Sequence, residues 1–158
     1  MKTIIGVIGA SEATPGERET ALEVGRRIAG KGAVLLSGGS GGVMEAACMG
    51  AKSEGGITVG IIPGASKSEA NGYVDIPVVT GMGHGRNIIV ASSCDAIIAI
   101  GGGFGTLSEI AFALRLKIPV VGIGTWDVSS EIKKAAGPGE AVDMAIELAG
   151  LIADSGLR

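Results

Sequence analysis

The stretch that decides the fold is AIIAIGGGFGTLSEIAFALRL, which spans residues 96–116. It opens with a continuous apolar run, passes through a cluster of glycines and continues with helical spacing of apolar residues. Continuous apolar runs are typical of strands that are covered on both faces, as in parallel sheets. Glycine allows the backbone to turn tightly and to approach a ligand closely. The stretch therefore predicts a buried strand, a glycine-rich turn and a helix.

The same order of features occurs twice more, in VLLSGGSGG at residues 34–42 and in VVTGMGHGR at residues 78–86. The start of a helix offers free N–H groups and a partial positive charge, which together favour phosphate and other anions. The carboxyl ends of parallel strands meet at one edge of a sheet, where ligands bind. The three glycine-rich turns therefore predict one shared anion-binding crevice.

Strand-like and helix-like segments alternate along the whole chain. This alternation predicts a single Rossmann-like domain over residues 1–158, an α/β three-layer sandwich with a mostly parallel sheet and helices on both faces. Two polar connections, 63–72 and 125–139, are candidate lids or edge loops. The predicted strands are 4–8, 33–36, 57–62, 74–79, 96–100 and 119–123, and the predicted helices are 15–29, 43–53, 85–93, 107–116 and 140–153.

Composition excludes several classes of partner. The net charge is −3 and no basic run occurs, which disfavours binding to nucleic acid or to an anionic membrane. The apolar runs are far shorter than the roughly 18 residues that a membrane span requires. The two cysteines, Cys48 and Cys94, match no metal or redox spacing, and the chain has one histidine. We therefore expect a cytoplasmic protein with reduced thiols and no metal site.

Arg86 is the most informative charged residue. It lies in the first turn of a predicted helix, where the helix dipole disfavours a cation unless an anion is bound there. The alternative is an ordinary solvated arginine. Together with the polar residues that follow the strands, Arg86 gives a predicted ligand-binding set: Ser11, Gly38, Gly39, Ser40, Gly41, Gly42, Arg86, Asn87, Gly102, Gly103, Gly105 and Thr106.

Two local motifs have alternative interpretations. Thr106 and Glu109 have the spacing of a capping box, a purely structural role. Ser40 lies in a G-x-S-x-G pattern, and Asp75 and His84 follow in the order of a serine-hydrolase triad. The structural alternative for Ser40 is the N-cap of the second helix. Neither the dinucleotide-binding G-x-G-x-x-G pattern nor the P-loop pattern occurs.

The motifs GGGFGTLSE at residues 101–109 and GGSGGVM at residues 38–44, together with Arg86, resemble a known superfamily. This Rossmann-like superfamily contains the LONELY GUY-type cytokinin-activating phosphoribohydrolases and the molybdenum cofactor carrier proteins. The similarity extends over nearly the whole chain. Thr80–Gly83, followed by Arg86 and Asn87, look most like the carrier-like bacterial and archaeal branch. The resemblance implies a homodimer or homotetramer that packs helices from the Arg86 and Thr106 regions.

The hydrolase branch cleaves the N-glycosidic bond of a nucleoside 5′-monophosphate to give free base and ribose 5-phosphate. Its essential arginine and glutamate correspond to Arg86 and Glu109. Three departures put this activity in doubt: Gly101 stands where the hydrolases have proline, Asn87 where they have lysine, and Ser108 where many have a second glutamate.

The carrier branch holds the phosphate of the pterin cofactor without cleaving it. The resemblance thus implies a protein that binds a nucleotide or molybdenum cofactor as its ligand and requires no cofactor of its own, with a nucleoside 5′-monophosphate phosphoribohydrolase as the alternative. Members have often been labelled lysine decarboxylases. That reaction usually needs pyridoxal phosphate on a lysine, and no lysine lies in a suitable loop of this chain.

Overall fold

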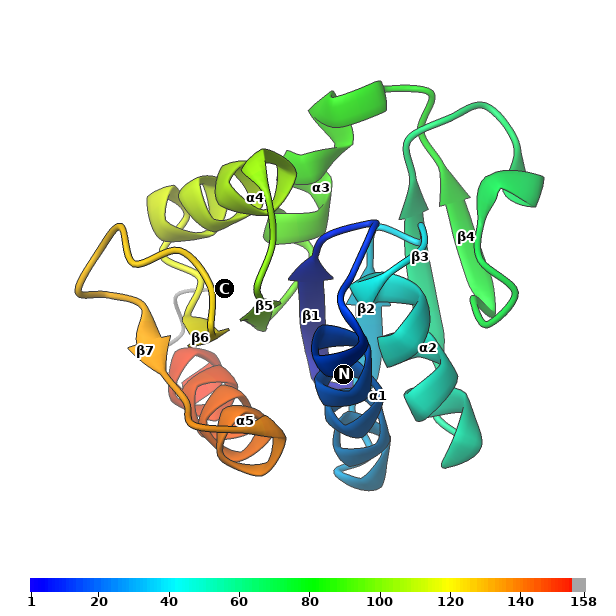
Figure 1. The fold of residues 1–158 in the computed structure, drawn as a ribbon. Helices are drawn as coiled ribbons and strands as arrows, with labels where there is room; N and C mark the ends of the chain where they lie inside the picture. Colours follow the sequence, from blue (N-terminus) through cyan, green and yellow to red (C-terminus); the bar gives the residue numbers. More distant parts are fainter. Residues whose placement is uncertain (155–158) are drawn as a thin grey trace.

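A seven-stranded sheet forms the centre of the molecule (Figure 1). The computed structural model describes residues 1–154, with side chains to Leu151. The strand order is β4-β3-β2-β1-β5-β6-β7, and every neighbouring pair is parallel. The strands are β1 Ile4–Gly9, β2 Val34–Ser37, β3 Thr58–Ile62, β4 Ile76–Val79, β5 Ala96–Ile100, β6 Val120–Ile123 and β7 Lys133–Lys134.

Helices cover both faces of the sheet. Helices α1, α2 and α5 pack on one face around the larger core cluster, whereas α3 and α4 pack on the other face (Figure 1). The predicted α/β Rossmann-like sandwich is confirmed. The α-helices are α1 Pro15–Gly30, α2 Val43–Ser53, α3 Asn87–Ser92, α4 Phe104–Arg115 and α5 Pro138–Asp154, and the 3-10 helices are η1 Lys67–Glu69 and η2 Gly83–Arg86.

The predicted connection 125–139 contains a strand that sequence analysis missed. Strand β7 has only two residues, both exposed lysines, so it carries no hydrophobic pattern. It pairs with β6, and Lys134 Nζ donates to Asp127 Oδ2 at 2.6 Å. The connection 63–72 instead contains the short helix η1. No helix within residues 1–154 is both long enough and apolar enough to cross a membrane.

The helix starts differ in how far the sequence predicts them. Helix α1 begins with the expected capping box, in which Thr14 and Glu17 bond to each other's backbone N–H groups. The Thr106–Glu109 capping box is wrong, because α4 already begins at Phe104 and Thr106 lies inside its first turn. Ser40 as an N-cap is also wrong. Gly42 occupies that position with a φ of 62° and no side-chain bond.

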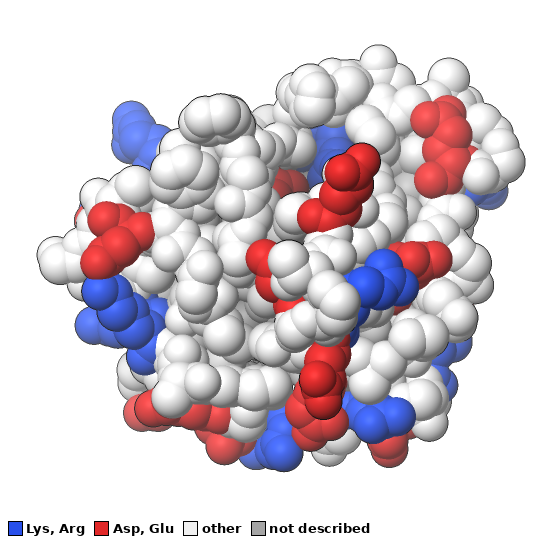
Figure 2. All heavy atoms as spheres, viewed as in Figure 1, with Lys and Arg blue, Asp and Glu red and all other residues white. Residues whose placement is uncertain are grey.

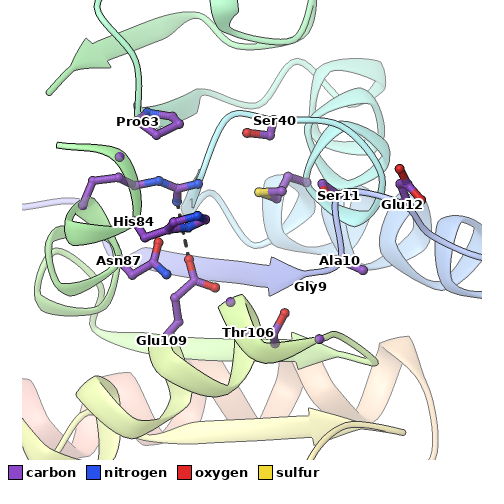
Figure 3. A pocket seen from close by; sticks show the side chains of 15 residues that line it. Gly9, Ala10, Ser11, Glu12, Ser40, Pro63, His84, Asn87, Thr106 and Glu109 are labelled. Atoms are coloured by element: carbon purple, nitrogen blue, oxygen red, sulfur yellow. Dashed lines mark hydrogen bonds and ion pairs between the residues drawn. The ribbon is translucent and has the colours of Figure 1, made fainter. Parts of the chain in front are cut away.

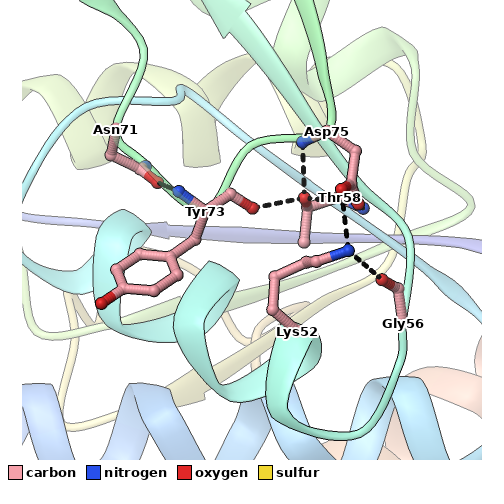
Figure 4. Close-up of polar contacts among 6 residues, drawn as sticks. All are labelled: Lys52, Gly56, Thr58, Asn71, Tyr73 and Asp75. Carbon is pink, nitrogen blue, oxygen red and sulfur yellow. Dashed lines mark hydrogen bonds and ion pairs between the residues drawn. The ribbon is translucent and has the colours of Figure 1, made fainter.

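A polar network closes the amino-terminal end of strands β3 and β4 (Figure 4). Asp75 accepts hydrogen bonds from Lys52 Nζ at 2.7 Å and from the Thr58 backbone N–H at 3.0 Å. These bonds hold the pKa of the Asp75 carboxyl below its usual value against the opposing effect of burial. Asp75 precedes β4 whereas His84 follows it, so the two residues of the proposed triad lie at opposite ends of that strand. The arrangement does not support a serine hydrolase.

Candidate ligand-binding site

A cavity of about 580 Å³ lies at the carboxyl end of the sheet (Figure 3). Its walls come from the turns that follow β1, β2, β3, β4 and β5, so segments far apart in the sequence meet there as predicted. The volume falls within the roughly 300–1,000 Å³ that is usual for small-molecule sites. The lining residues are Gly9, Ala10, Ser11, Glu12, Ser40, Met44, Pro63, Gly83, His84, Arg86, Asn87, Gly103, Gly105, Thr106 and Glu109.

Arg86 and Glu109 form a buried ion pair in this cavity. Arg86 lies at the end of η2 and is 7% exposed, and Glu109 on α4 is 6% exposed. The Arg86 Nη1 atom donates to Glu109 Oε1 over 3.4 Å, which is long for a charge-assisted bond. The Arg86 Nε atom is buried and has no hydrogen-bond partner in the structure. Arg86 is therefore not a solvated surface arginine, and its guanidinium has hydrogen-bonding capacity left for a ligand.

Burial shifts the pKa values of Glu109 and Arg86 in opposite directions. Burial raises the pKa of Glu109 from 4.5 to about 7, and the nearby guanidinium opposes this rise without cancelling it. Burial also lowers the pKa of Arg86, which Glu109 opposes. An arginine remains a cation at neutral pH even so. The site thus combines a permanent cation with a carboxyl that exchanges a proton near neutral pH.

Two glycines within residues 38–42 leave the space that neighbouring groups of the site require. A β-carbon at Gly38 would overlap the guanidinium of Arg86, so glycine at this position makes room for the buried cation. At Gly42, where φ is 62°, a β-carbon would overlap the Ala10 carbonyl oxygen. The Val43 N–H donates to that same oxygen at 3.0 Å, which joins the turn after β2 to the turn after β1.

The structure brings eight predicted residues together at the cavity: Ser11, Ser40, Arg86, Asn87, Gly103, Gly105, Thr106 and Glu109. Five predicted glycines do not line it, namely Gly38, Gly39, Gly41, Gly42 and Gly102. Sequence analysis missed six lining residues, Gly9, Ala10, Glu12, Met44, Pro63 and Gly83, and it considered His84 only as part of a triad. Most of the missed residues lie in turns directly after predicted strands, and that position was the available signal.

Two of the three departures from the hydrolase pattern are in contact. The Asn87 side-chain amide donates to Ser108 Oγ at 2.8 Å, and Ser108 Oγ donates to the Gly105 carbonyl at 2.7 Å. A neutral pair therefore stands where the resemblance places a lysine and, in many members, a glutamate. The Asn87–Ser108 bond therefore links the start of α3 to the first turns of α4 through neutral groups.

The charge near the cavity is mixed. Among the side chains that line it, Arg86 is the permanent cation, while Glu12 and Glu109 are carboxyls. Figure 2 shows acidic and basic side chains interspersed over this face of the molecule, without a continuous basic patch. A long polyanion requires such a patch, whereas a single phosphate group does not.

The model of the SLOG cluster4 family matches residues 2–151. The chain belongs to this family. Among solved structures, this SLOG cluster4 protein is similar to a molybdenum cofactor binding protein from Rippkaea orientalis, with 39% identity, a TM-score of 0.89 and coverage of 94% of this chain and 98% of the other. It is also similar to the molybdenum cofactor carrier protein of Chlamydomonas reinhardtii, with 38% identity, a TM-score of 0.87 and coverage of 95% and 99%.

A more distant relative is an enzyme. The cytokinin riboside 5′-monophosphate phosphoribohydrolase of Mycobacterium tuberculosis is 39% identical over 95 residues, which are 58% of this chain and 51% of the enzyme. The match thus covers about half of the enzyme's length. The superfamily identified by resemblance is confirmed, because the relatives of this SLOG cluster4 protein include both carrier proteins and phosphoribohydrolases.

Proposed function

We propose that this SLOG cluster4 protein binds a small phosphorylated ligand with a nucleotide-like or pterin ring and releases it unchanged. The observation that carries the proposal is the buried Arg86, which lines the cavity and whose guanidinium lacks a full set of partners, since its Nε atom makes no hydrogen bond. A buried guanidinium with an unused donor is costly unless a ligand satisfies it. A phosphate oxygen suits this guanidinium, because arginine forms strong charge-assisted bonds to phosphate.

The rest of the cavity supports a phosphorylated ligand of this size. Ser11, Ser40 and Thr106 bring hydroxyl groups to it from three different turns. The 12-residue helix α4 begins at its wall, so free backbone N–H groups are available for an anion there. The similarity to molybdenum cofactor binding and carrier proteins over almost the full length supports a pterin cofactor as the cargo.

The proposal is tested by binding measurements with the wild-type protein and Arg86→Ala. Adenosine 5′-monophosphate and a pterin phosphate serve as probes in thermal-shift and calorimetric titrations, because a ligand that binds only the folded state raises its stability. We expect Arg86→Ala to weaken binding at least tenfold, the loss of one charge-assisted bond. The matched control is Arg115→Ala, which removes an exposed arginine at the far end of α4. Equal affinity in wild type and Arg86→Ala would contradict the proposal.

A second candidate function is hydrolysis of a nucleoside 5′-monophosphate. The observation in its favour is Glu109, which retains the position of the hydrolase glutamate and has a pKa of about 7. A carboxyl with such a pKa suits general acid–base work at neutral pH. Chromatography after incubation with adenosine 5′-monophosphate tests this function. Release of free base that disappears in Glu109→Ala would favour the enzyme, whereas tight binding without release would favour the carrier.

A further inference from the structure

The charges around the cavity are poorly balanced for the ligand proposed above. A phosphate monoester carries close to two negative charges at neutral pH. Arg86 faces it with one positive charge, and Glu12 and Glu109 add acidic groups to the same walls. Of the side chains that line this cavity, only Arg86 and His84 can carry a positive charge. His84 is therefore the lining side chain that can supply a second positive charge to the phosphate.

His84 is placed where it can serve this purpose. It lies in η2, two residues before Arg86, and it lines the cavity while remaining exposed to solvent. Figure 3 shows its ring extending into the cavity, between Pro63 and Glu109 in this view. Within residues 1–154, the imidazole has no hydrogen-bond or ion-pair partner in the protein, so its nitrogen atoms remain available to a ligand.

The turn that carries His84 is fixed to its neighbour. The Gly81 N–H donates to the Gly64 carbonyl at 2.9 Å, and the Gly83 N–H donates to the Pro63 carbonyl at 2.9 Å. These two bonds hold the turn after β4 against the turn after β3. A supported backbone lowers the entropy that is lost when a side chain engages a ligand. His84 is thus an accessible side chain on an ordered support.

We propose that His84 is a ligand-binding residue, and that its imidazolium form donates a charge-assisted hydrogen bond to the phosphate of the ligand. The inference rests on the proposed function and adds to it a dependence on pH. Histidine is the side chain whose charge normally changes between pH 5 and 8. A protonated imidazole holds an anion more tightly than a neutral one, so anion affinity should be higher in acid and lower as the pH rises.

Other charged and titratable groups near His84 also affect how anion binding depends on pH. Arg86, on the same element, stays charged throughout. Glu12, from the turn after β1, and Glu109, from α4, face the same cavity, while Pro63 and Gly64 contribute no titratable group. Burial raises the pKa of Glu109 to about 7, so protonation of Glu109 also favours an anion in acid. The contribution of His84 must therefore be separated from that of Glu109.

Nuclear magnetic resonance provides the first test, because His84 is the single histidine among 158 residues. The imidazole carbon-bound proton of untagged protein is followed from pH 5 to 8.5, with and without saturating adenosine 5′-monophosphate. We expect the ligand to shift this signal and to move its titration midpoint to higher pH. A ligand that raises the melting temperature but leaves the signal and its midpoint unchanged would overturn this inference alone. If neither adenosine 5′-monophosphate nor the pterin phosphate bound to the protein, the proposed function would be overturned as well.

Sulfate affinity at pH 6 and pH 8 provides the second test, because sulfate remains a dianion at both values. Amide shifts report binding to wild type, His84→Gln, His84→Lys and the double variant His84→Gln/Glu109→Gln. We expect His84→Gln to bind about tenfold more weakly than wild type at pH 6 and almost equally at pH 8. His84→Lys should bind tightly at both values, and the double variant should show no dependence on pH.

The matched control is Lys117→Gln, which removes an exposed cation from the end of the sheet opposite the cavity. It should bind sulfate like wild type at both pH values, because its charge is far from the site and screened by salt. Equal sulfate affinity for wild type and His84→Gln at pH 6 would overturn the assignment. An equal loss in Lys117→Gln would do the same, since it would attribute the effect to net charge.

Discussion

Arg86 and Glu109 each lower the stability of the fold when taken alone, but as a pair they equip the cavity to bind a ligand. Each is more than nine-tenths buried, where an isolated charge is strongly destabilising. Their mutual attraction over 3.4 Å offsets part of that cost, but the unpartnered Nε atom shows that the pair does not satisfy itself. Residues that reduce stability in the absence of ligand are expected at functional sites. The pair therefore supports ligand binding more than it supports the fold.

Stability should fall with rising pH because of Glu109. Its pKa is about 7 in the folded protein and near 4.5 when unfolded, so the folded state binds the proton more tightly. The stabilisation by this proton is fully present below pH 4.5 and is lost as the pH rises through 7. Between pH 6 and 8.5, wild type should lose about 1 kcal/mol of unfolding free energy relative to Glu109→Gln.

Urea denaturation of both proteins at these two pH values measures the difference. Both values lie above the isoelectric point of about 5.2, which favours solubility. Other titrating groups are shared by the two proteins and cancel in the comparison. Parallel stability profiles for wild type and Glu109→Gln would contradict the raised pKa.

At the scale of elements, helices α1 and α2 pack unusually close together. A β-carbon at Gly25 of α1 would overlap the Ala47 carbonyl of α2, and one at Gly50 of α2 would overlap the Leu22 carbonyl of α1. The two helices thus approach at two glycines, backbone against backbone. This contact fixes the turns after β1 and β2, because those turns lead into α1 and α2. The helix pair therefore sets the shape of one wall of the cavity.

Substitutions in α1 can test this close packing. Gly25→Ala should destabilise the protein by about 1–3 kcal/mol, because the added methyl group would force the helices apart. Gly16→Ala in the same helix is the matched control, since open space surrounds that position. It should stabilise by about 0.5–1 kcal/mol through higher helix propensity and a less flexible unfolded chain. Chemical denaturation measures both, and equal effects at the two positions would argue against the close contact.

At the scale of the whole molecule, apolar side chains remain exposed on the layer formed by α3 and α4. Phe104 is 82% exposed and Ile88 is 40% exposed. Phe104 stacks on Trp126 with ring centroids 5.9 Å apart, which leaves most of its surface free. Burial of these side chains against another copy of the chain would remove their apolar surface from water. We propose that this layer is the contact between copies in a homodimer or homotetramer.

Light scattering coupled to size-exclusion chromatography tests the oligomer. The wild-type protein should elute at two or four times the chain mass of 15.6 kDa. Phe104→Glu should shift it toward the monomer, because it places a charge in an apolar contact. Leu151→Glu is the control, since Leu151 is 59% exposed but lies on α5 in the opposite layer. A wild-type monomer, or dissociation caused by Leu151→Glu alone, would contradict this interface.

The sequence by itself determined the layers of the molecule. Six strands and five helices follow from apolar periodicity, because strands buried on both faces require continuous apolar runs and helices require a spacing of 3.6 residues. Strand β4 has the apolar run without the burial, since three of its four residues are exposed at the edge of the sheet. The capping box at Thr14 and Glu17 was predictable for the same reason: it depends on neighbours in the chain. Strand β7 was not predictable, because two exposed lysines join the sheet only through backbone pairing with β6.

Only the tertiary structure decided the roles of the residues at the cavity. Glu109 has the spacing of a capping partner, yet it faces Arg86, which is 23 positions away in the sequence. Gly38 has the pattern of a ligand loop, yet it makes room for that guanidinium. His84 became a candidate because Glu12, Glu109 and Arg86 line the same cavity. Such roles depend on burial and on charges brought together by the sheet, and neither is encoded in the local order of residues.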